Sequence, residues 1–180
     1  MPFLALPALA LTALLVACHG APPAAPVAFP DHIGDFTRQD FTSQGAAYAD
    51  DSDPSLTVTV RIGRQISANS LVPALDLGAG DNVDAAIARA GAGIKRFYPT
   101  AKLALDEPLY LMRDGALKEG RHQSWRYRDQ ILGAPAEVAM DFVINCCNDK
   151  GELVSVWFRH RADQPIEPEL LGFLDAVPWE

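Results

Sequence analysis

Two histidines and one aspartate have side chains suited to proton transfer or metal binding. His122, Asp141 and His160 lie in three separate segments whose residues alternate as in β-strands. If these strands neighbour one another, the side chains can form a small metal site or an acid–base pair, because imidazole titrates near neutral pH and binds transition metals. The shared parity of His160 and Phe158 instead favours a histidine held within the core. Both interpretations stay open.

A second group of candidate binding residues lies on strands, at positions whose side chains should point away from the expected core. Trp157 shares its parity with Arg159 and Arg161, and Arg61 points outward from its own strand. An exposed tryptophan among arginines suits an anionic or aromatic ligand, because guanidinium pairs with anions bidentately and indole stacks. The alternative is a mixed-charge solvent face on which a helix or loop covers Trp157. We favour that alternative, although this patch is the best binding surface that the sequence offers.

The remaining motifs lack the spacing that known chemistry requires. GAGDNV lacks the third glycine of a dinucleotide fingerprint, and GAGIKRF lacks the first glycine and the Ser/Thr of a phosphate loop. The acidic stretch DDSDP lacks the ligand spacing of a calcium loop. No GxSxG nucleophile motif or CxxC pair occurs. The sequence therefore predicts no cofactor, no metal site of standard spacing and no enzyme activity.

The first 18 residues point to export and membrane attachment. Residues 2–17 carry no charge, but 16 residues are fewer than the ~20 that cross a bilayer, and they match the apolar core of a signal peptide. The run Leu15-Val16-Ala17-Cys18 resembles the lipobox of bacterial lipoprotein precursors. The resemblance implies a signal peptide over 1–17 and acyl chains, such as palmitate, on Cys18, which hold the protein stably at the membrane.

Alternatives to the lipobox remain. No Lys or Arg precedes the apolar run, which indicates a weak signal or a true start upstream. The signal can also be an ordinary cleaved one, with Cys18 incidental. In Gram-negative lipoproteins an Asp after the lipidated cysteine tends to retain the protein at the inner membrane. Because His19 stands there, the resemblance points to the periplasmic side of the outer membrane.

Composition separates a tether from one domain. Residues 18–30 are rich in proline and alanine and predict an extended spacer. Residues 31–180 have the length of one domain with its own core. The formal net charge of −8 argues against nucleic acid as a partner and leaves an envelope protein as the expected one. Adjacent Cys146 and Cys147 are badly placed to bond each other on a strand, so an exposed Cys147 can form an intermolecular disulfide.

Periodicity predicts the elements of this domain. The stretches SLTVTVRI, HQSWRYRDQ, EVAMDFVIN and ELVSVWFRHR alternate as strands. The last two form a hairpin across NDKG, where Gly151 can adopt a positive φ. IGDFTRQDFTSQGAAYA supplies a partner strand, with Phe36 and Tyr48 as core contacts. A helix follows Asp81 or Asn82, and a shorter helix, which Asp163 can cap, closes the chain. The apolar residues expected to be buried on these two helices are Val83, Ile87, Ala90, Ile94, Phe97, Ile166, Leu170, Phe173, Leu174 and Val177.

The expected fold class is α+β, with a long helix and a C-terminal helix packed as one layer on an antiparallel sheet. The body faintly resembles small exported domains of the PsbP-like kind. That resemblance implies an architecture only. We therefore expect a lipid-anchored, non-enzymatic binding domain, with small-ligand or metal binding at Trp157 and the arginines, or at His122 and His160, as the alternative.

Overall fold

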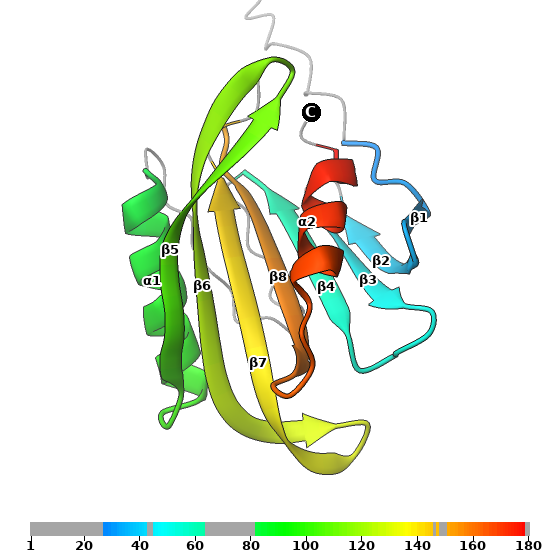
Figure 1. Cartoon of the computed structure of the whole chain (residues 1–180), viewed down its shortest axis with the longest axis vertical. Helices are drawn as coiled ribbons and strands as arrows, with labels where there is room; N and C mark the ends of the chain where they lie inside the picture. The colour runs from blue at the N-terminus through cyan, green and yellow to red at the C-terminus, as the bar shows by residue number, and fades with distance from the viewer. Residues whose placement is uncertain (1–26, 43–44, 64–81, 146, 148–150, 179–180) are drawn as a thin grey trace, which may run out of the picture.

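The computed structural model describes residues 27–42, 45–63, 82–145, 147 and 151–178. Figure 1 shows an antiparallel sheet with one helix on each side of it. The sheet has eight strands in the order β1-β2-β3-β4-β8-β7-β6-β5, and every neighbouring pair is antiparallel. The strands are β1 (His32–Ile33), β2 (Phe36–Thr42), β3 (Gly45–Asp50), β4 (Thr57–Ile62), β5 (Lys102–Arg113), β6 (Ala116–Ile131), β7 (Ala134–Asn145) and β8 (Val154–Arg161).

Helix α1 (Val83–Phe97) covers the sheet face formed by β6 and β7, here called the helix-1 face. The Asn82 side chain caps the helix by accepting a hydrogen bond from the Ala85 backbone N–H at 2.9 Å. Gly91 lets the helix approach the sheet, because a Cβ there would lie 2.8 Å from the Trp125 ring. The buried residues between this helix and the sheet include Ile87, Ala90, Ile94, Trp125, Met140, Phe142 and Trp157.

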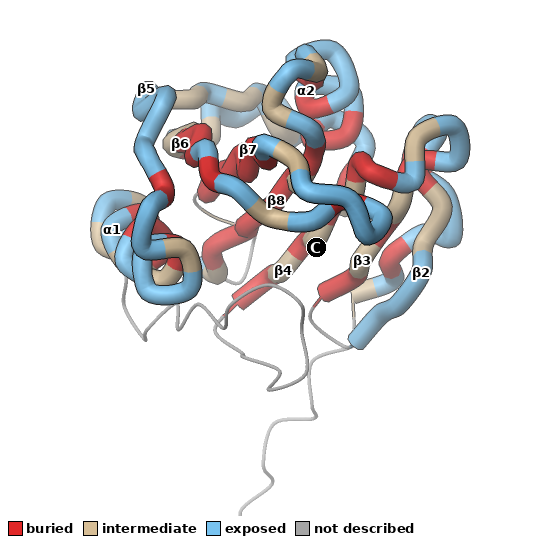
Figure 2. The backbone as a smooth tube through the Cα atoms, turned by 90° about the horizontal axis from the view of Figure 1, so that it is seen from below, coloured by how far each residue is buried: buried red, intermediate tan, exposed pale blue. Residues whose placement is uncertain are grey.

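Helix α2 (Glu167–Ala176) covers the opposite, helix-2 face of the sheet, as Figure 2 shows. The Phe173 ring makes edge-to-face contacts with Phe36, Tyr48 and Phe158, with ring centroids 5.2 to 5.5 Å apart. The other buried residues on this face include Val58, Val60, Val156, Leu170, Leu174 and Val177. The helices thus enclose two separate cores, one on each face of the sheet.

The α+β class with an antiparallel sheet and two helices is confirmed, but the single layer of helices is wrong. Val138, Met140, Phe142 and Ile144 on β7 face α1, whereas Val156 and Phe158 on β8 face α2. Both faces of the central strands are buried, so alternation along one strand could not tell which face holds the core. The domain has three layers in the order helix, sheet, helix.

Three local expectations also need correction. Phe97 is exposed at the end of α1, where the chain turns towards β5. Helix α2 begins at Glu167 rather than after Asp163, and no side chain caps it. The stretch before residue 50 forms two strands, β2 and β3, in place of one. As predicted, Phe36 and Tyr48 are buried, and Gly151 has a positive φ of 72°.

The two hairpins of the C-terminal half have two-residue turns of the same kind. Asp114 and Gly115 join β5 to β6 with φ of 48° and 75°, and Leu132 and Gly133 join β6 to β7 with φ of 51° and 81°. Two consecutive positive φ angles match the twist of antiparallel strands. Among the described helices, neither has the length and apolarity needed to cross a bilayer.

Candidate functional site

Three polar side chains converge on the helix-2 face of β6, β7 and β8. Asp141 pairs in register with Phe158, so both side chains point to the same face. His122 on β6 and His160 on β8 lie one diagonal step from Asp141, on either side of it. The Nε2 atom of His122 lies 2.8 Å from Oδ1 of Asp141, and the Nε2 atom of His160 lies 2.7 Å from Oδ2. The two histidines meet through the aspartate, because β7 separates their strands.

The protonation of this His122–Asp141–His160 network follows from its burial and its charges. Burial raises the pKa of Asp141, but hydrogen bonds from His122 and His160 outweigh burial and lower that pKa to about 2. Burial lowers the pKa of His122. The neighbouring carboxylates of Asp141 and Glu107 raise this pKa by more than burial lowers it, so the net pKa lies above its ordinary value. Asp141 is therefore ionised near neutral pH, and His122 gains affinity for a proton.

The network opens to solvent only at His122. Its side chain is 13% exposed, and its Nδ1 atom lies 3.5 Å from Oε1 of Glu107 on β5. His160 is buried, and its Nδ1 atom has no hydrogen-bond partner among the described residues. The arrangement can therefore exchange a proton with solvent at His122. No group of three or more His, Cys, Asp or Glu side chains in the described part of the chain is placed to hold a metal ion.

Trp157 lies on the same sheet face as the arginines of the candidate binding patch, the helix-1 face, but its side chain is buried. The pairing of Arg61 with Ser155 puts Arg61 on the same face as Trp157 and Arg159, as the alternation predicts. The indole is only 3% exposed, and its ring centroid lies 3.7 Å from that of Phe142. Binding of a ligand by stacking on Trp157 requires an exposed indole, and this indole is buried. The structure therefore agrees with the alternative that we favoured, in which Trp157 is covered.

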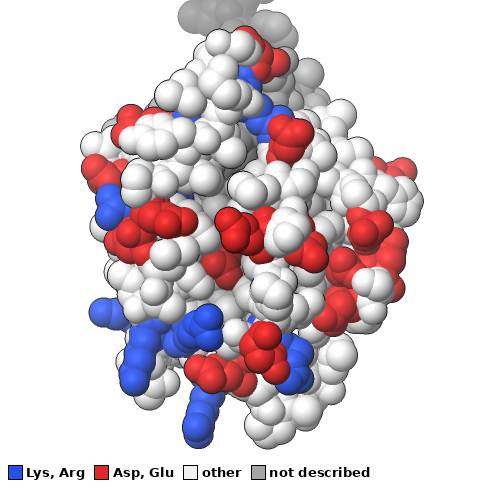
Figure 3. Space-filling view, in the orientation of Figure 1, with Lys and Arg blue, Asp and Glu red and all other residues white. Residues whose placement is uncertain are grey.

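The strand arginines of this group contact acidic neighbours. Arg159 donates to Asp129 at 3.1 Å and to the Gln130 carbonyl at 2.7 Å. Arg161 forms an exposed ion pair with Asp163 at 3.1 Å. Burial lowers the pKa of Arg61. Figure 3 shows, on the side that carries α2, basic side chains gathered at the lower end of the molecule and acidic ones across the middle.

Asp129 belongs to a polar cluster that the sequence did not indicate. It accepts a hydrogen bond from the Tyr98 hydroxyl at 3.1 Å, and Tyr98 stacks on Tyr127 with ring centroids 3.9 Å apart. Burial is the main cause that raises the pKa of both tyrosine hydroxyls. The cluster ties the end of α1 to β6.

The clearest surface feature is an exposed apolar patch on the β5–β6 hairpin. Met112 pairs directly with Leu117, and Tyr110 lies two residues before Met112 on the same side of the hairpin. Met112 is 61% and Leu117 is 62% exposed. Leu109 and Leu111, on the other side of β5, pack against the helix-2 core. One side of the hairpin is thus anchored on the body, and Tyr110, Met112 and Leu117 on the other side meet solvent; we call these three residues the hairpin patch.

Neither Glu107 nor the hairpin patch was predicted, because the residue pattern between 98 and 121 did not indicate a strand. The signal available was the apolar run from Leu109 to Met112, which two acidic residues and Pro108 precede.

The cysteines bear on the predicted anchor. Cys18 and Cys146 lie outside the described residues, as do the whole signal segment and residues 18–26 of the tether. Cys147 is disulfide-bonded. The exposed position that the sequence suggested for Cys147 is wrong, because Cys147 is partly buried against the helix-1 core.

Comparisons with known proteins give weak structural similarity alone. No known family and no curated protein matches the sequence. The fold resembles the cyanobacterial PsbP protein CyanoP of Synechocystis sp. PCC 6803, with a TM-score of 0.45, 13% identity, and coverage of 82% of this chain and 83% of that one. It also resembles PA94 of Pseudomonas aeruginosa, a putative regulator of unknown function, with a TM-score of 0.41, 12% identity, and coverage of 81% and 97%. The chain thus has weak structural similarity to PsbP-like and PA94 folds.

Proposed function

We propose that this chain is a lipid-anchored, non-enzymatic protein of the bacterial envelope, whose domain binds another envelope component. The observation that carries the anchor is the run Leu15-Val16-Ala17-Cys18 at the end of an uncharged apolar segment. A proline-rich stretch then leads to the domain, where Phe29 is buried in the helix-2 core and the Tyr48 hydroxyl donates to the Pro30 carbonyl at 3.1 Å. The lipid is thus joined to the body by a short tether that ends on the core.

A binding role is favoured over catalysis by how the polar groups are used. Both carboxylate oxygens of Asp141 accept hydrogen bonds from histidines, so both are engaged within the fold. The exposed apolar side chains gather instead on the hairpin. Four of the nine large exposed hydrophobic residues of the described chain lie on β5 and a fifth on β6. Because such patches mark interaction surfaces, we assign binding to this hairpin.

The anchor is tested by intact-mass analysis of the membrane fraction from cells that produce the full chain. We expect a mature protein that begins at Cys18 and carries acyl mass, and Cys18→Ala should lose both the acyl mass and the membrane attachment. His19→Ala is the matched control, because it alters the adjacent residue and leaves the lipobox intact. A soluble product without acyl mass would refute the anchor.

A second candidate function is binding of a small organic ligand at His122. It is favoured by the position of this partly exposed imidazole between the carboxylates of Asp141 and Glu107. Thermal unfolding with a panel of small organic cations tests this candidate. A rise in Tm for the wild type that is absent in His122→Gln would support it, and no rise with any probe would exclude these ligands.

A further inference from the structure

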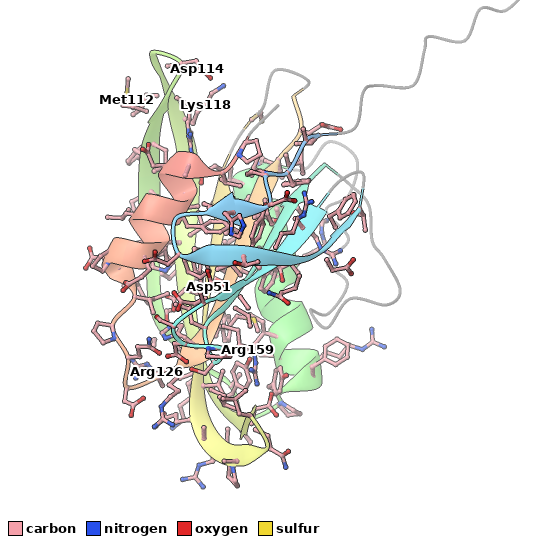
Figure 4. All side chains as sticks on the ribbon, turned by 90° about the vertical axis from the view of Figure 1, so that its right-hand side faces the viewer. Asp51, Met112, Asp114, Lys118, Arg126 and Arg159 are labelled. Atoms are coloured by element: carbon pink, nitrogen blue, oxygen red, sulfur yellow. The ribbon has the colours of Figure 1, made fainter. Side chains whose placement is uncertain are left out.

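The hairpin patch and the start of the domain lie at the same end of the molecule. Figures 1 and 4, which are turned by 90° about the long axis, both show the β5–β6 turn near the upper end, and the described chain begins in this upper part of the molecule. Figure 4 shows Met112 projecting away from the body, with Lys118 on the opposite side of the hairpin. The hairpin patch therefore points outward at the end of the domain where the tether arrives.

The length of the tether limits how far this end can be from a membrane. Nine residue steps separate Cys18 from Val27 (27 − 18 = 9). At no more than about 3.5 Å per residue, they span at most about 30 Å. Val27 packs against the helix-2 core, so the chain cannot gain reach by peeling from the body without losing that contact. A lipid on Cys18 would therefore hold the hairpin end of the domain close to the bilayer.

The hairpin is held in a fixed position from the side opposite the patch. Arg113 donates to the Asp175 carbonyl at the end of α2 at 2.6 Å, and Lys118 donates to the Cys147 carbonyl at 2.8 Å. These contacts use the polar side chains near the tip on the body side. The apolar side chains remain for the outer side, and a tyrosine beside aliphatic residues suits the bilayer interface.

We propose that Tyr110, Met112 and Leu117 insert into the membrane leaflet that holds the lipid of Cys18. The inference rests on the proposed anchor and names the envelope component that the hairpin binds as the lipid bilayer itself. The hairpin then acts as a second membrane contact, which fixes the tilt of the domain and turns the β6–β7 end away from the bilayer. Because β6 has 16 residues at about 3.3 Å each, its two turns lie about 50 Å apart.

Fluorescence quenching tests this contact. The acylated full chain carrying Tyr110→Trp is reconstituted in vesicles of phosphatidylethanolamine and phosphatidylglycerol, with or without brominated acyl chains. Leu132→Trp is the matched control, because Leu132 is 77% exposed at the opposite end of β6. We expect brominated lipid to quench the added emission of Tyr110→Trp and to leave that of Leu132→Trp unchanged.

Substitutions that introduce charge into the hairpin patch give a second test of the membrane contact. Adding Met112→Glu and Leu117→Glu to Tyr110→Trp should abolish the quenching without loss of the acyl mass, whereas Leu171→Glu on α2 should leave it unchanged. Equal quenching at both tryptophan positions, or none at position 110 in an acylated protein, would overturn this inference alone. In the latter case the hairpin patch would be assigned to a protein partner. Absence of acyl mass would overturn the anchor and this inference with it.

Discussion

Asp141→Asn removes the charge on which the buried network depends, and its effect should appear in the pH dependence of stability. The pKa of Asp141 falls from its ordinary 3.8 to about 2 in the fold. At about 1.4 kcal/mol for each pKa unit, this difference is worth about 2 kcal/mol of folding free energy. Because the pKa is depressed, the contribution is complete above pH 3.8 and is lost as the pH falls towards 2.

Urea unfolding at a series of pH values between 6 and 2 measures this contribution. The wild type should lose about 2 kcal/mol more than Asp141→Asn over this range, since the amide has no proton to gain. Near neutral pH the variant should be less stable by about 2 to 3 kcal/mol, because one histidine N–H then faces the amide NH₂. Asp163→Asn is the control, because that carboxylate is exposed and its ion pair with Arg161 is screened by solvent.

The His122 resonances give an independent readout. With Asp141 replaced, burial remains and the largest cause that raises the pKa of His122 is gone, so this pKa should fall. In the wild type the raised pKa stabilises the fold fully below pH 6.5, and this stabilisation is lost as the pH rises through the folded pKa. The reasoning is refuted if wild type and Asp141→Asn show the same loss of stability from pH 6 to pH 2.

Three further predictions concern the helices, a turn and sorting. In thermal melts, Gly91→Ala should lower Tm despite its better helix propensity, because the new Cβ would lie 2.8 Å from the buried Trp125 ring. Gly172→Ala is the matched control: nothing surrounds a Cβ there, so this variant should stabilise the fold by up to about 1 kcal/mol. Leu132→Asn should raise the unfolding free energy by about 0.5 to 1 kcal/mol in urea titrations, because asparagine tolerates the positive φ of 51° better than leucine; an unchanged midpoint would contradict this. If the lipoprotein proposal holds, His19→Asp should move the protein from the outer to the inner membrane on density-gradient fractionation, and unchanged distribution would count against the sorting argument.

The elements that the sequence predicted are those with a clear apolar period. The alternation of Val58, Val60 and Ile62 defined β4, and the helical spacing of Ile87, Ala90 and Ile94 defined the buried side of α1. A strand is least visible in sequence when neither of its sides is fully buried. β5 is such a strand, because it lies at the sheet edge, and so both Glu107 and the hairpin patch escaped prediction.

The parts of the site that depend on distant pairings were beyond the sequence. Alternation placed His160 and Asp141 on strands, but the distance between them depends on the register of β7 with β8. The burial of Trp157 depends on which helix covers which side of the sheet. That choice follows from the packing of α1 (Val83–Phe97), which lies far earlier in the chain than Trp157.

The strand order also has a consequence for how the chain folds. The strands β1 to β4 and β5 to β8 form two meanders of consecutive hairpins, and the single junction between them is the pairing of β4 with β8. Local hairpins close quickly, whereas this junction joins residues about 100 positions apart and must overcome a larger loop-closure entropy. The docking of the two meanders is then the expected slow step, completed when α2, which directly follows β8, packs across the N-terminal half. Substitutions in the β4–β8 seam should slow refolding more than equally destabilising ones inside either meander.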